Sequence, residues 1–331
     1  MSFGRTTLQA MLACLGIGLA GPLAAQDTQP VRVILDWAWR PHHAPFAMAL
    51  KNGYFTEEGL DVKLEQGRGS ATAATLLGQG QFDIAHLNVT NAAQAIAKGV
   101  PIKAVAVYQT RSAAAFIGTE ATPDFASADD LRKLRIGSTP GGSDGLSLSI
   151  FARKNGLTVD DFNVVGMEGS GKTAALLQGQ VDVVSGDSYA FDALVRAGGK
   201  TPKIMLLADH GVPLMGFGFA TNDTYAAEHP EQITSFLRAI HRGFESALAD
   251  PAAACEEMRT TYEIVGTNEA CVAYFTNLAA LSQKPDDPQW GVQSAEQWDA
   301  LIGALKEVGE VPEDKAAADF WTNDFQPTAA N

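Results

Sequence analysis

Short apolar runs alternate with amphipathic segments along most of the chain. Residues 31–35, 102–107 and 134–137 are apolar runs of strand length, and 146–154 has apolar residues at helical spacing. Strands that alternate with helices are typical of α/β domains with largely parallel sheets. From residue 229 onward the spacing is mainly helical, starting with apolar residues at every third or fourth position. The pattern predicts α/β units followed by a helical region.

One segment of the sequence recurs about a hundred residues later. Residues 169–182 repeat the pattern of 69–83, including L-x-x-G-Q-x-D, with one residue inserted or lost. The second copy overlaps G-x-x-x-x-G-K-T at 166–173, which by itself is typical of a phosphate-binding loop. The first copy has no Gly-Lys-Thr, and the helix predicted after Thr173 is short. We therefore interpret the segment as a repeated structural unit and expect no nucleotide site.

The length of the chain and this repeat together predict two lobes. A chain of 331 residues is longer than one compact core usually supports. The order of the elements fits a chain that leaves one lobe, builds a second and returns. We expect lobe 1 to comprise 30–118 and 215–325, and lobe 2 to comprise 119–214.

The N-terminal segment 1–25 has the features of a secretory signal peptide. Arg5 precedes an apolar run at 8–23 that is too short to span a bilayer, and small residues stand before Gln26. Lipidation of Cys14 is a weaker alternative that stays open. No later stretch is long enough for a transmembrane helix, so we expect an exported, periplasmic protein.

The charge and the cysteines narrow the possible partners. The formal net charge is −14, and removal of Arg5 with the leader makes it −15, which argues against nucleic acid and anionic membranes as partners. Two cysteines, Cys255 and Cys271, lie beyond the leader on neighbouring predicted helices. In an exported chain such a pair suggests a disulfide, and two separately buried thiols are the alternative.

Residues 36–43, D-W-A-W-R-P-H-H, form the stretch with the most candidate chemistry. They follow a predicted strand and precede a short predicted helix, where α/β proteins often bind small molecules. The alternative is that the two Trp belong to the core and the two His to a solvated loop. His42 and His43 are adjacent, which is poor spacing for one metal ion, and His86 sits in a strand pattern that suggests an interior position. We expect no catalytic residues, metal or cofactor.

Several motifs resemble those of extracytoplasmic solute-binding proteins of ABC importers. They are L-D-W at 35–37, His43, G-Y-F-x-E-E-G-L-D-V at 53–62, G-G-S at 141–143 and the repeated L-x-x-G-Q-x-D. The group that binds thiamine-pyrimidine precursors is the most similar, and related groups bind sulfonates, taurine, nitrate or riboflavin. The resemblance covers nearly the whole mature chain. It implies a two-lobed periplasmic-binding-protein fold of type II, in which helices flank each sheet and a ligand cleft separates the lobes.

The resemblance also implies ligand contacts from both lobes. The pyrimidine group typically reads D-W-x-P-N-x-x-H, and here Trp39 and Arg40 replace the Pro and the Asn. An Arg at this place favours an anionic group, while the Trp side chains suit a flat ring. The expected ligand-binding residues are Asp36, Trp37, Trp39, Arg40, His43, Asn88, Thr90, Gly142, Ser143, Asp144, Asp187 and Tyr189.

We accordingly expect a monomer that captures a small heteroaromatic or anionic solute by hinge closure and delivers it to an ABC permease with its ATPase. Some relatives of the pyrimidine-binding group are synthases that consume one of their own histidines, at a position matching His43. Those enzymes carry a cysteine-rich iron motif that is absent here. We therefore expect no enzyme. A periplasmic sensor that docks on a signalling receptor is a further alternative.

Overall fold

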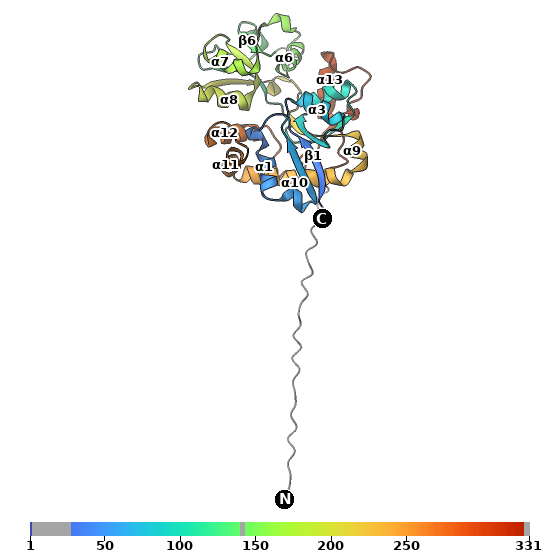
Figure 1. Cartoon of the computed structure of the whole chain (residues 1–331). Coiled ribbons are helices and arrows are strands. Elements are labelled where there is room, and N and C mark those ends of the chain that lie inside the picture. Colours follow the sequence, from blue (N-terminus) through green and yellow to red (C-terminus); the bar gives the residue numbers. More distant parts are fainter. Residues whose placement is uncertain (2–27, 140–142, 328–331) are drawn as a thin grey trace.

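The computed structural model describes residue 1 and residues 28–139 and 143–327. The expected signal peptide at 1–25, Cys14 and Gly142 lie outside the described residues. The described chain forms two bodies, seen one above the other in Figure 1. Among the described helices, none combines the length and the apolar character that a membrane crossing requires.

The lower body in Figure 1 is built on a five-stranded sheet with the order β2-β1-β3-β10-β4. Its strands are β1 (Gln29–Ile34), β2 (Leu60–Glu65), β3 (Ile84–Asn88), β4 (Ile102–Val107) and β10 (Phe217–Asn222). β1 runs parallel to β2 and β3, whereas β10 is antiparallel to both of its neighbours. β3 consists mainly of buried residues, as expected for a strand covered on both faces, whereas β1 is buried mainly in its second half.

The upper body contains a second five-stranded sheet with the order β7-β6-β8-β5-β9. Its strands are β5 (Ala114–Thr119), β6 (Arg135–Ser138), β7 (Asn163–Gly166), β8 (Val183–Asp187) and β9 (Pro202–Leu206). The two sheets share one plan, in which β5 takes the antiparallel place that β10 takes in the first sheet. The predicted two-lobed α/β class is confirmed, and each sheet is mixed because of this one reversed strand. The expected boundary at 118 has to be corrected, since β5 pairs within the second sheet.

Helices cover both sheets. The first lobe has α1 (Ala44–Lys51), α2 (Tyr54–Glu57), α3 (Ser70–Gly78), α4 (Val89–Ala97), α9 (Asp223–Glu228), α10 (Pro230–Ala249), α11 (Pro251–Thr261), α12 (Asn268–Ala279) and α13 (Ala295–Glu307). The second has α5 (Ala128–Leu131), α6 (Ser143–Lys154), α7 (Lys172–Leu177) and α8 (Ser188–Ala197). α10 buries its apolar face, and Gly243 lets it approach α1 closely, because a Cβ atom there would lie 2.3 Å from the carbonyl oxygen of Pro45.

The repeated sequence segment forms the same structural clamp in each lobe. Arg32 on β1 binds Asp83 through its backbone N–H and its guanidinium, with an Nη2–Oδ1 distance of 2.6 Å. Arg135 on β6 binds Asp182 in the same way, at 2.7 Å. Both guanidiniums also donate to carbonyl oxygens of the preceding Gly-containing turn. The Asp of L-x-x-G-Q-x-D therefore serves the fold, which agrees with a structural interpretation of the repeat.

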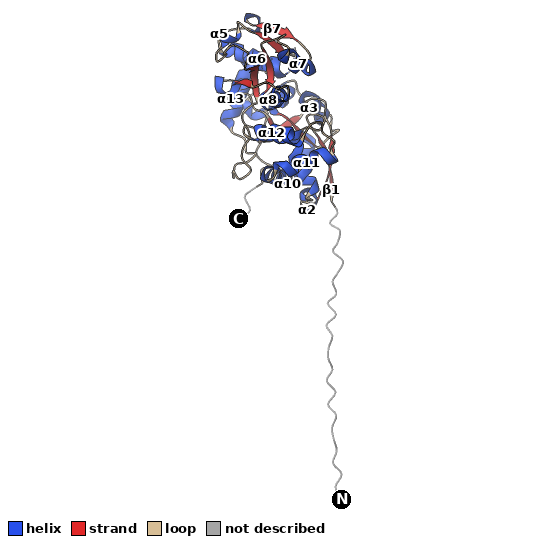
Figure 2. Cartoon of the chain, turned by 90° about the vertical axis from the view of Figure 1, so that its left-hand side faces the viewer, coloured by secondary structure: helices blue, strands red, loops and turns tan. Residues whose placement is uncertain are grey.

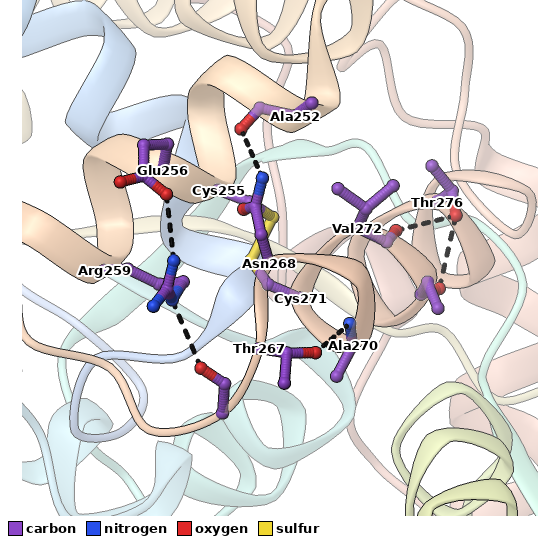
Figure 3. Close-up of a disulfide and its surroundings, with 12 residues drawn as sticks. Ala252, Cys255, Glu256, Arg259, Thr267, Asn268, Ala270, Cys271, Val272 and Thr276 are labelled. Atoms are coloured by element: carbon purple, nitrogen blue, oxygen red, sulfur yellow. Dashed lines mark hydrogen bonds and ion pairs between the residues drawn. A yellow bond between two sulfur atoms is a disulfide. The ribbon is translucent and has the colours of Figure 1, made fainter.

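Cys255 and Cys271 are paired in the structure. Cys255 on α11 and Cys271 on α12 form a disulfide across neighbouring helices (Figure 3). Both residues are buried, and hydrogen bonds such as Asn268 Nδ2 to the carbonyl oxygen of Ala252 join the same helices. The pair fixes α12, which forms part of the wall of the cleft described below.

The chain passes between the lobes in two adjacent segments, 108–113 and 207–216. Backbone hydrogen bonds join them, from Ser112 to Leu214 and between Gln109 and Gly216. At the opposite side of the cleft, α8 of the second lobe packs on α12 of the first. Figure 2 shows this interface from the side. The lobes thus meet at a two-segment connection and at two helix–helix contacts, the second of which joins α13 to α6 and includes the ion pair of Lys154 with Glu307.

Candidate functional site

A cavity of about 330 Å³ lies between the two lobes. This is within the usual size range of small-molecule sites. Its walls combine aromatic rings, hydroxyl groups and carboxylates from both lobes. The main lining residues are Asp36, Trp37, Arg40, His42, Ser70, Asn88, Thr90, Ser112, Ser143, Asp144, Lys172, Asp187, Tyr189, Phe217 and Tyr274.

The loop after β1 carries the first-lobe part of the site and is held against a glycine turn. Gly67 donates to the carbonyl oxygen of Trp37, and Gly69 donates to that of Asp36. A Cβ atom at Gly67 would lie 1.9 Å from the carbonyl oxygen of Leu35, so only glycine permits this approach. The turn leads into α3, where Ser70 accepts a hydrogen bond from the backbone of Asn88. Backbone contacts therefore fix the start of the loop against this turn.

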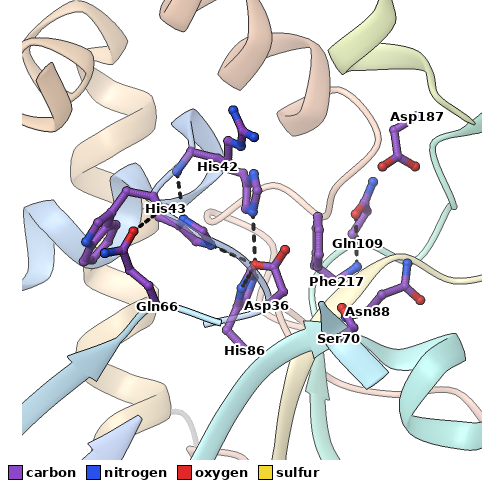
Figure 4. Close-up of polar contacts among 12 residues, drawn as sticks. Asp36, His42, His43, Gln66, Ser70, His86, Asn88, Gln109, Asp187 and Phe217 are labelled. Carbon is purple, nitrogen blue, oxygen red and sulfur yellow. Dashed lines mark hydrogen bonds and ion pairs between the residues drawn. The ribbon is translucent and has the colours of Figure 1, made fainter. Parts of the chain in front are cut away.

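Three imidazoles converge on one carboxylate oxygen at the floor of the cleft (Figure 4). Oδ1 of Asp36 lies 3.1 Å from Nε2 of His42, 2.8 Å from Nε2 of His43 and 3.0 Å from Nδ1 of His86. All four residues are buried, and only Asp36 and His42 line the cavity. Sequence analysis found no set of metal ligands here. The fold, however, brings one ligand atom each of Asp36, His42, His43 and His86 within 4.8 Å of the others.

The ring nitrogens that face away from Asp36 also have partners. Nδ1 of His43 accepts a hydrogen bond from the backbone N–H of Arg40, so neutral His43 carries its proton on Nε2. Nδ1 of His42 pairs with the hydroxyl of Tyr274, and Nε2 of His86 pairs with that of Tyr108. The Asp36 carboxylate only accepts, so Nε2 of His42 and Nδ1 of His86 carry the protons that face it, and the tyrosine hydroxyls can donate to the outer nitrogens.

Burial and the cluster itself shift the pKa values of its members. Burial alone would raise the pKa of Asp36, but the charge of His42 and the imidazole hydrogen bonds outweigh it and hold the pKa well below the ordinary value. Burial lowers the pKa of His43 to about 3 and lowers the pKa of His86 as well. Asp36 is therefore an ionised acceptor and His43 and His86 are neutral at physiological pH.

The second lobe places Asp187 opposite this cluster. Asp187 ends β8 and its carboxylate projects into the cleft, where the hydroxyl of Tyr189 donates to Oδ2 at 3.2 Å. It stands at the N-terminus of α8, yet its side chain makes no capping hydrogen bond. Desolvation by the enclosing walls raises the pKa of Asp187, although the carboxylate is exposed to the cleft itself. The aromatic ring of Tyr189 packs edge-on against Tyr274 of the first lobe.

Asp144 is engaged within the second lobe. Its Oδ2 accepts from Nζ of Lys172 at 2.8 Å and from the backbone N–H of Thr139 at 2.8 Å. Lys172, the lysine of the G-K-T sequence, also donates to the carbonyl oxygen of Ser185 and is buried. A carboxylate of the chain itself therefore occupies the place where an anionic ligand would approach this lysine.

Of the residues expected to bind ligand, ten line the cavity or join its floor and one does not. Asp36, Trp37, Arg40, Asn88, Thr90, Ser143, Asp144, Asp187 and Tyr189 line it, and His43 lies just beneath, fully buried. Trp39 is directed elsewhere, where its ring packs against Tyr262 at a centroid distance of 4.1 Å. Gly142 lies outside the described residues.

Sequence analysis missed several residues of the cleft. Tyr274 and Phe217 come from segments far from the first stretch in sequence, and no local motif marks either of them. His42 was noticed only as a neighbour of His43. Lys172 was noticed only as part of a rejected phosphate-binding loop. The lining therefore combines the aromatic rings of Trp37, Phe217 and Tyr274 with carboxylates from both lobes.

Solved structures similar to this chain share its fold. The periplasmic aliphatic sulphonate binding protein SsuA from Escherichia coli aligns with a TM-score of 0.72 at 15% identity, over 90% of this chain and 99% of that one. The periplasmic nitrate-binding protein NrtA from Synechocystis aligns with a TM-score of 0.68 at 12% identity, over 90% and 87%. At these identities the similarity concerns the fold.

Curated relatives have two kinds of name. A formylaminopyrimidine-binding protein from Halalkalibacterium halodurans is 26% identical over 90% of this chain and 92% of its own. A 4-amino-5-hydroxymethyl-2-methylpyrimidine phosphate synthase from Aspergillus parasiticus is 27% identical over 76% and 78%. Several other fungal relatives, 23–24% identical, have the same synthase name. The expectation that the chain is no enzyme is therefore wrong as stated, because relatives named as enzymes match most of its length.

A family model settles the wider relationship. The model described as NMT1/THI5 like matches residues 40–254, which is well over half of the chain and includes most of both lobes. The matched range begins in the loop that carries the histidine pair and ends next to the disulfide. The chain belongs to the NMT1/THI5 like family.

Proposed function

We propose that the chain is the extracytoplasmic solute-binding component of an ABC importer. The observation that carries the proposal is the cavity of about 330 Å³ between two lobes, to which both lobes contribute polar and aromatic side chains. In such a protein the solute stabilises a closed form that the permease recognises. The proposed location is the periplasm, and the proposed partners of the monomer are the permease and its ATPase. The names of the sulphonate- and nitrate-binding neighbours support this role.

We propose further that the solute is a small heteroaromatic molecule that carries N–H donors. Asp187 and Asp36 offer carboxylate oxygens from opposite walls of the cleft, and Trp37 offers a ring face. A carboxylate that accepts a hydrogen bond selects for a donor on the solute. Arg40 also lines the cleft, so an anionic group on the solute is the alternative. The binding protein named for formylaminopyrimidine supports the first class.

A thermal-shift screen of the purified protein tests both solute classes. The panel contains aminopyrimidines, sulfonates, aromatic acids and flavins, and calorimetry then measures the affinity of each compound that stabilises the protein. We expect aminopyrimidines to stabilise it and Asp187→Asn to remove most of that effect, while Arg40→Ala leaves it in place. Stabilisation only by sulfonates or aromatic acids, lost in Arg40→Ala, would identify the anionic class instead. Absence of any stabilising solute would argue against the transport role.

A second candidate is synthesis of a pyrimidine phosphate. It is favoured by the synthase names of the relatives and by the resemblance of His43 to the histidine that such synthases consume. The test is mass spectrometry of the purified protein and its small-molecule products after incubation in cell extract. A pyrimidine phosphate product that depends on His43, with a matching loss of mass from the His43 peptide, would establish the synthase. An unchanged peptide with solute bound would support the transport role.

A further inference from the structure

The cluster beneath the cleft has a composition that neither the transport role nor the solute contacts require. A single carboxylate would need one or two hydrogen bonds to stay ionised, yet Asp36 Oδ1 meets three imidazole nitrogens. One ligand atom from each of Asp36, His42, His43 and His86 lies within 4.8 Å of the others, and all four residues are buried. Imidazole nitrogens with one carboxylate oxygen are the donor set of many zinc, iron, cobalt and manganese sites.

We propose that Asp36, His42 and His86 bind one divalent first-row transition-metal ion at the floor of the cleft. Two histidines and one carboxylate leave positions of the ion open. Asp36 and His42 line the cavity, so these open positions face the cleft.

The hydrogen bonds of the outer ring nitrogens indicate which histidines can bind the ion and which one only orients Asp36. Nδ1 of His43 receives the N–H of Arg40, so the proton of neutral His43 sits on Nε2, the atom that faces Asp36. That nitrogen has no lone pair for a metal, and His43 instead donates to Asp36 and orients it. His43 is a positioning residue in this proposal.

His42 and His86 have the outer partners that metal-bound histidines need. A ligating imidazole usually donates its other N–H to an oxygen. The hydroxyl of Tyr274 lies 3.1 Å from Nδ1 of His42, and the hydroxyl of Tyr108 lies 2.7 Å from Nε2 of His86. Each can accept that proton in the ion-bound form, in which the inner nitrogen exchanges its hydrogen bond with Oδ1 of Asp36 for a bond to the ion.

Asp36 has an oxygen available for coordination. Among the described residues all three imidazole contacts go to Oδ1, and no hydrogen bond reaches Oδ2. The side chain is only 9% exposed, and this exposed part faces the cleft. Bonds of about 2.0–2.2 Å require ligand atoms roughly 3.3–3.5 Å apart, whereas Nε2 of His42 and Nδ1 of His86 lie 3.1 Å and 3.0 Å from Oδ1 of Asp36, so these side chains shift slightly apart when the ion binds.

The open positions suggest a role in the cleft. A ring nitrogen or a carbonyl of the solute could complete the coordination, a step that rests on the proposed solute-binding function. Metal binding itself does not depend on that function. The two can therefore fail separately.

Cobalt(II) titration of the chelator-treated full chain tests the metal site, because bound Co²⁺ is visible by its absorption and needs no solute. We expect one equivalent of Co²⁺ per chain, displaced by Zn²⁺. We expect His42→Ala and His86→Ala each to weaken binding at least about 100-fold and His43→Gln, which keeps an N–H donor, to weaken it less than about tenfold. Tyr274→Phe keeps the ring and removes only the hydroxyl, so we expect it to weaken cobalt binding about tenfold. This variant still tests the site if a histidine variant does not fold.

His210→Ala is the matched control, because His210 is an exposed histidine away from the cleft. It is expected to leave cobalt binding unchanged. Absence of a one-equivalent cobalt complex would overturn the proposal. A cobalt complex that still forms in a folded Asp36→Ala variant would overturn it as well. The same holds if His210→Ala weakens cobalt binding as much as His42→Ala does. A solute titration with and without Co²⁺ then shows separately whether the ion contributes to solute affinity.

Discussion

At the scale of single residues, the proposed function assigns the selection of solutes to the carboxylates of the cleft. Asp144 is bonded to Lys172 and to its own loop, whereas Asp187 has only the hydroxyl of Tyr189 as a side-chain partner among the described residues. Asp36 is held from behind by the histidines, and its other oxygen is exposed to the cavity. Asp187 is therefore the residue where a solute N–H gains most.

Asp187→Asn replaces a charged acceptor by a neutral amide of the same shape. A hydrogen bond to a charged group contributes about 1.5–3 kcal/mol, so we expect affinity for an aminopyrimidine to fall roughly 10- to 100-fold. Calorimetry measures the change, and Asp160→Asn on the exposed surface serves as the control. Equal affinities of the Asp187→Asn and Asp160→Asn variants would show that Asp187 does not bind the solute.

Solute affinity should also depend on pH through Asp187. Desolvation raises the pKa of this carboxyl, so it takes up a proton at a higher pH than an ordinary aspartate. The protonated form loses its charge, and affinity should therefore fall as the pH decreases through that raised value. Titrations between pH 4 and pH 8 should show the fall in the wild type and a flatter profile in Asp187→Asn. A fall of the same size in both would assign the pH dependence to another group.

Trp37→Ala tests the aromatic contact. The indole is 44% exposed and lines the cavity, so its loss should leave the fold intact. Stacking and lost burial together amount to about 1.5 kcal/mol, which predicts roughly tenfold weaker binding with little change in melting temperature. Trp39→Ala is an informative comparison, because its ring packs on Tyr262 and should affect stability more than affinity. Unchanged affinity in Trp37→Ala would count heavily against the site.

At the scale of elements, the disulfide matters because it joins α11 to α12, and α12 carries Tyr274 into the cleft. The closed loop spans 16 residues. A loop of this length predicts about 3 kcal/mol of stabilisation. We expect Cys255→Ala/Cys271→Ala to unfold at a markedly lower denaturant concentration, and a reductant to destabilise the wild type but not the double variant. If the reductant destabilises the wild type and the double variant equally, the disulfide is not the source of the stabilisation.

At the scale of the whole molecule, closure depends on few direct contacts between the lobes. Nδ2 of Asn277 on α12 donates to Oδ2 of Asp192 on α8 at 3.1 Å, beside the contact of Tyr274 with Tyr189. The rest of the connection is the pair of crossing segments and the contact of α13 with α6, where Lys154 pairs with Glu307. A small change at this contact should shift the balance between open and closed forms.

Asn277→Ala removes that hydrogen bond without touching the cavity lining. A net loss of about 1 kcal/mol predicts roughly fivefold weaker solute binding and a larger radius of gyration in small-angle X-ray scattering. Thr276→Ala on the exposed side of the same helix is the control. If both variants scatter and bind like the wild type, the contact does not hold the closed form.

The sequence by itself determined much of the architecture. Periodicity of apolar residues indicated the strands and the long helix α10, because side-chain alternation is a local property of each element. The repeat of L-x-x-G-Q-x-D indicated two similar lobes, and the Arg32–Asp83 and Arg135–Asp182 clamps explain why the repeat exists. The stretch 36–43 indicated where the site begins.

Only the tertiary structure decided which of these residues meet. Asp36 and His86 are 50 positions apart, and His42 and Tyr274 are 232 apart. They come together because β3 pairs beside β1 and because α12 returns to the first lobe after the chain has built the second. The directions of Trp37 and Trp39 were likewise undecided in the sequence, since two rings of the same type two positions apart differ only in what packs around them. Local pattern specifies an element, and the strand order and the return of the chain specify the site.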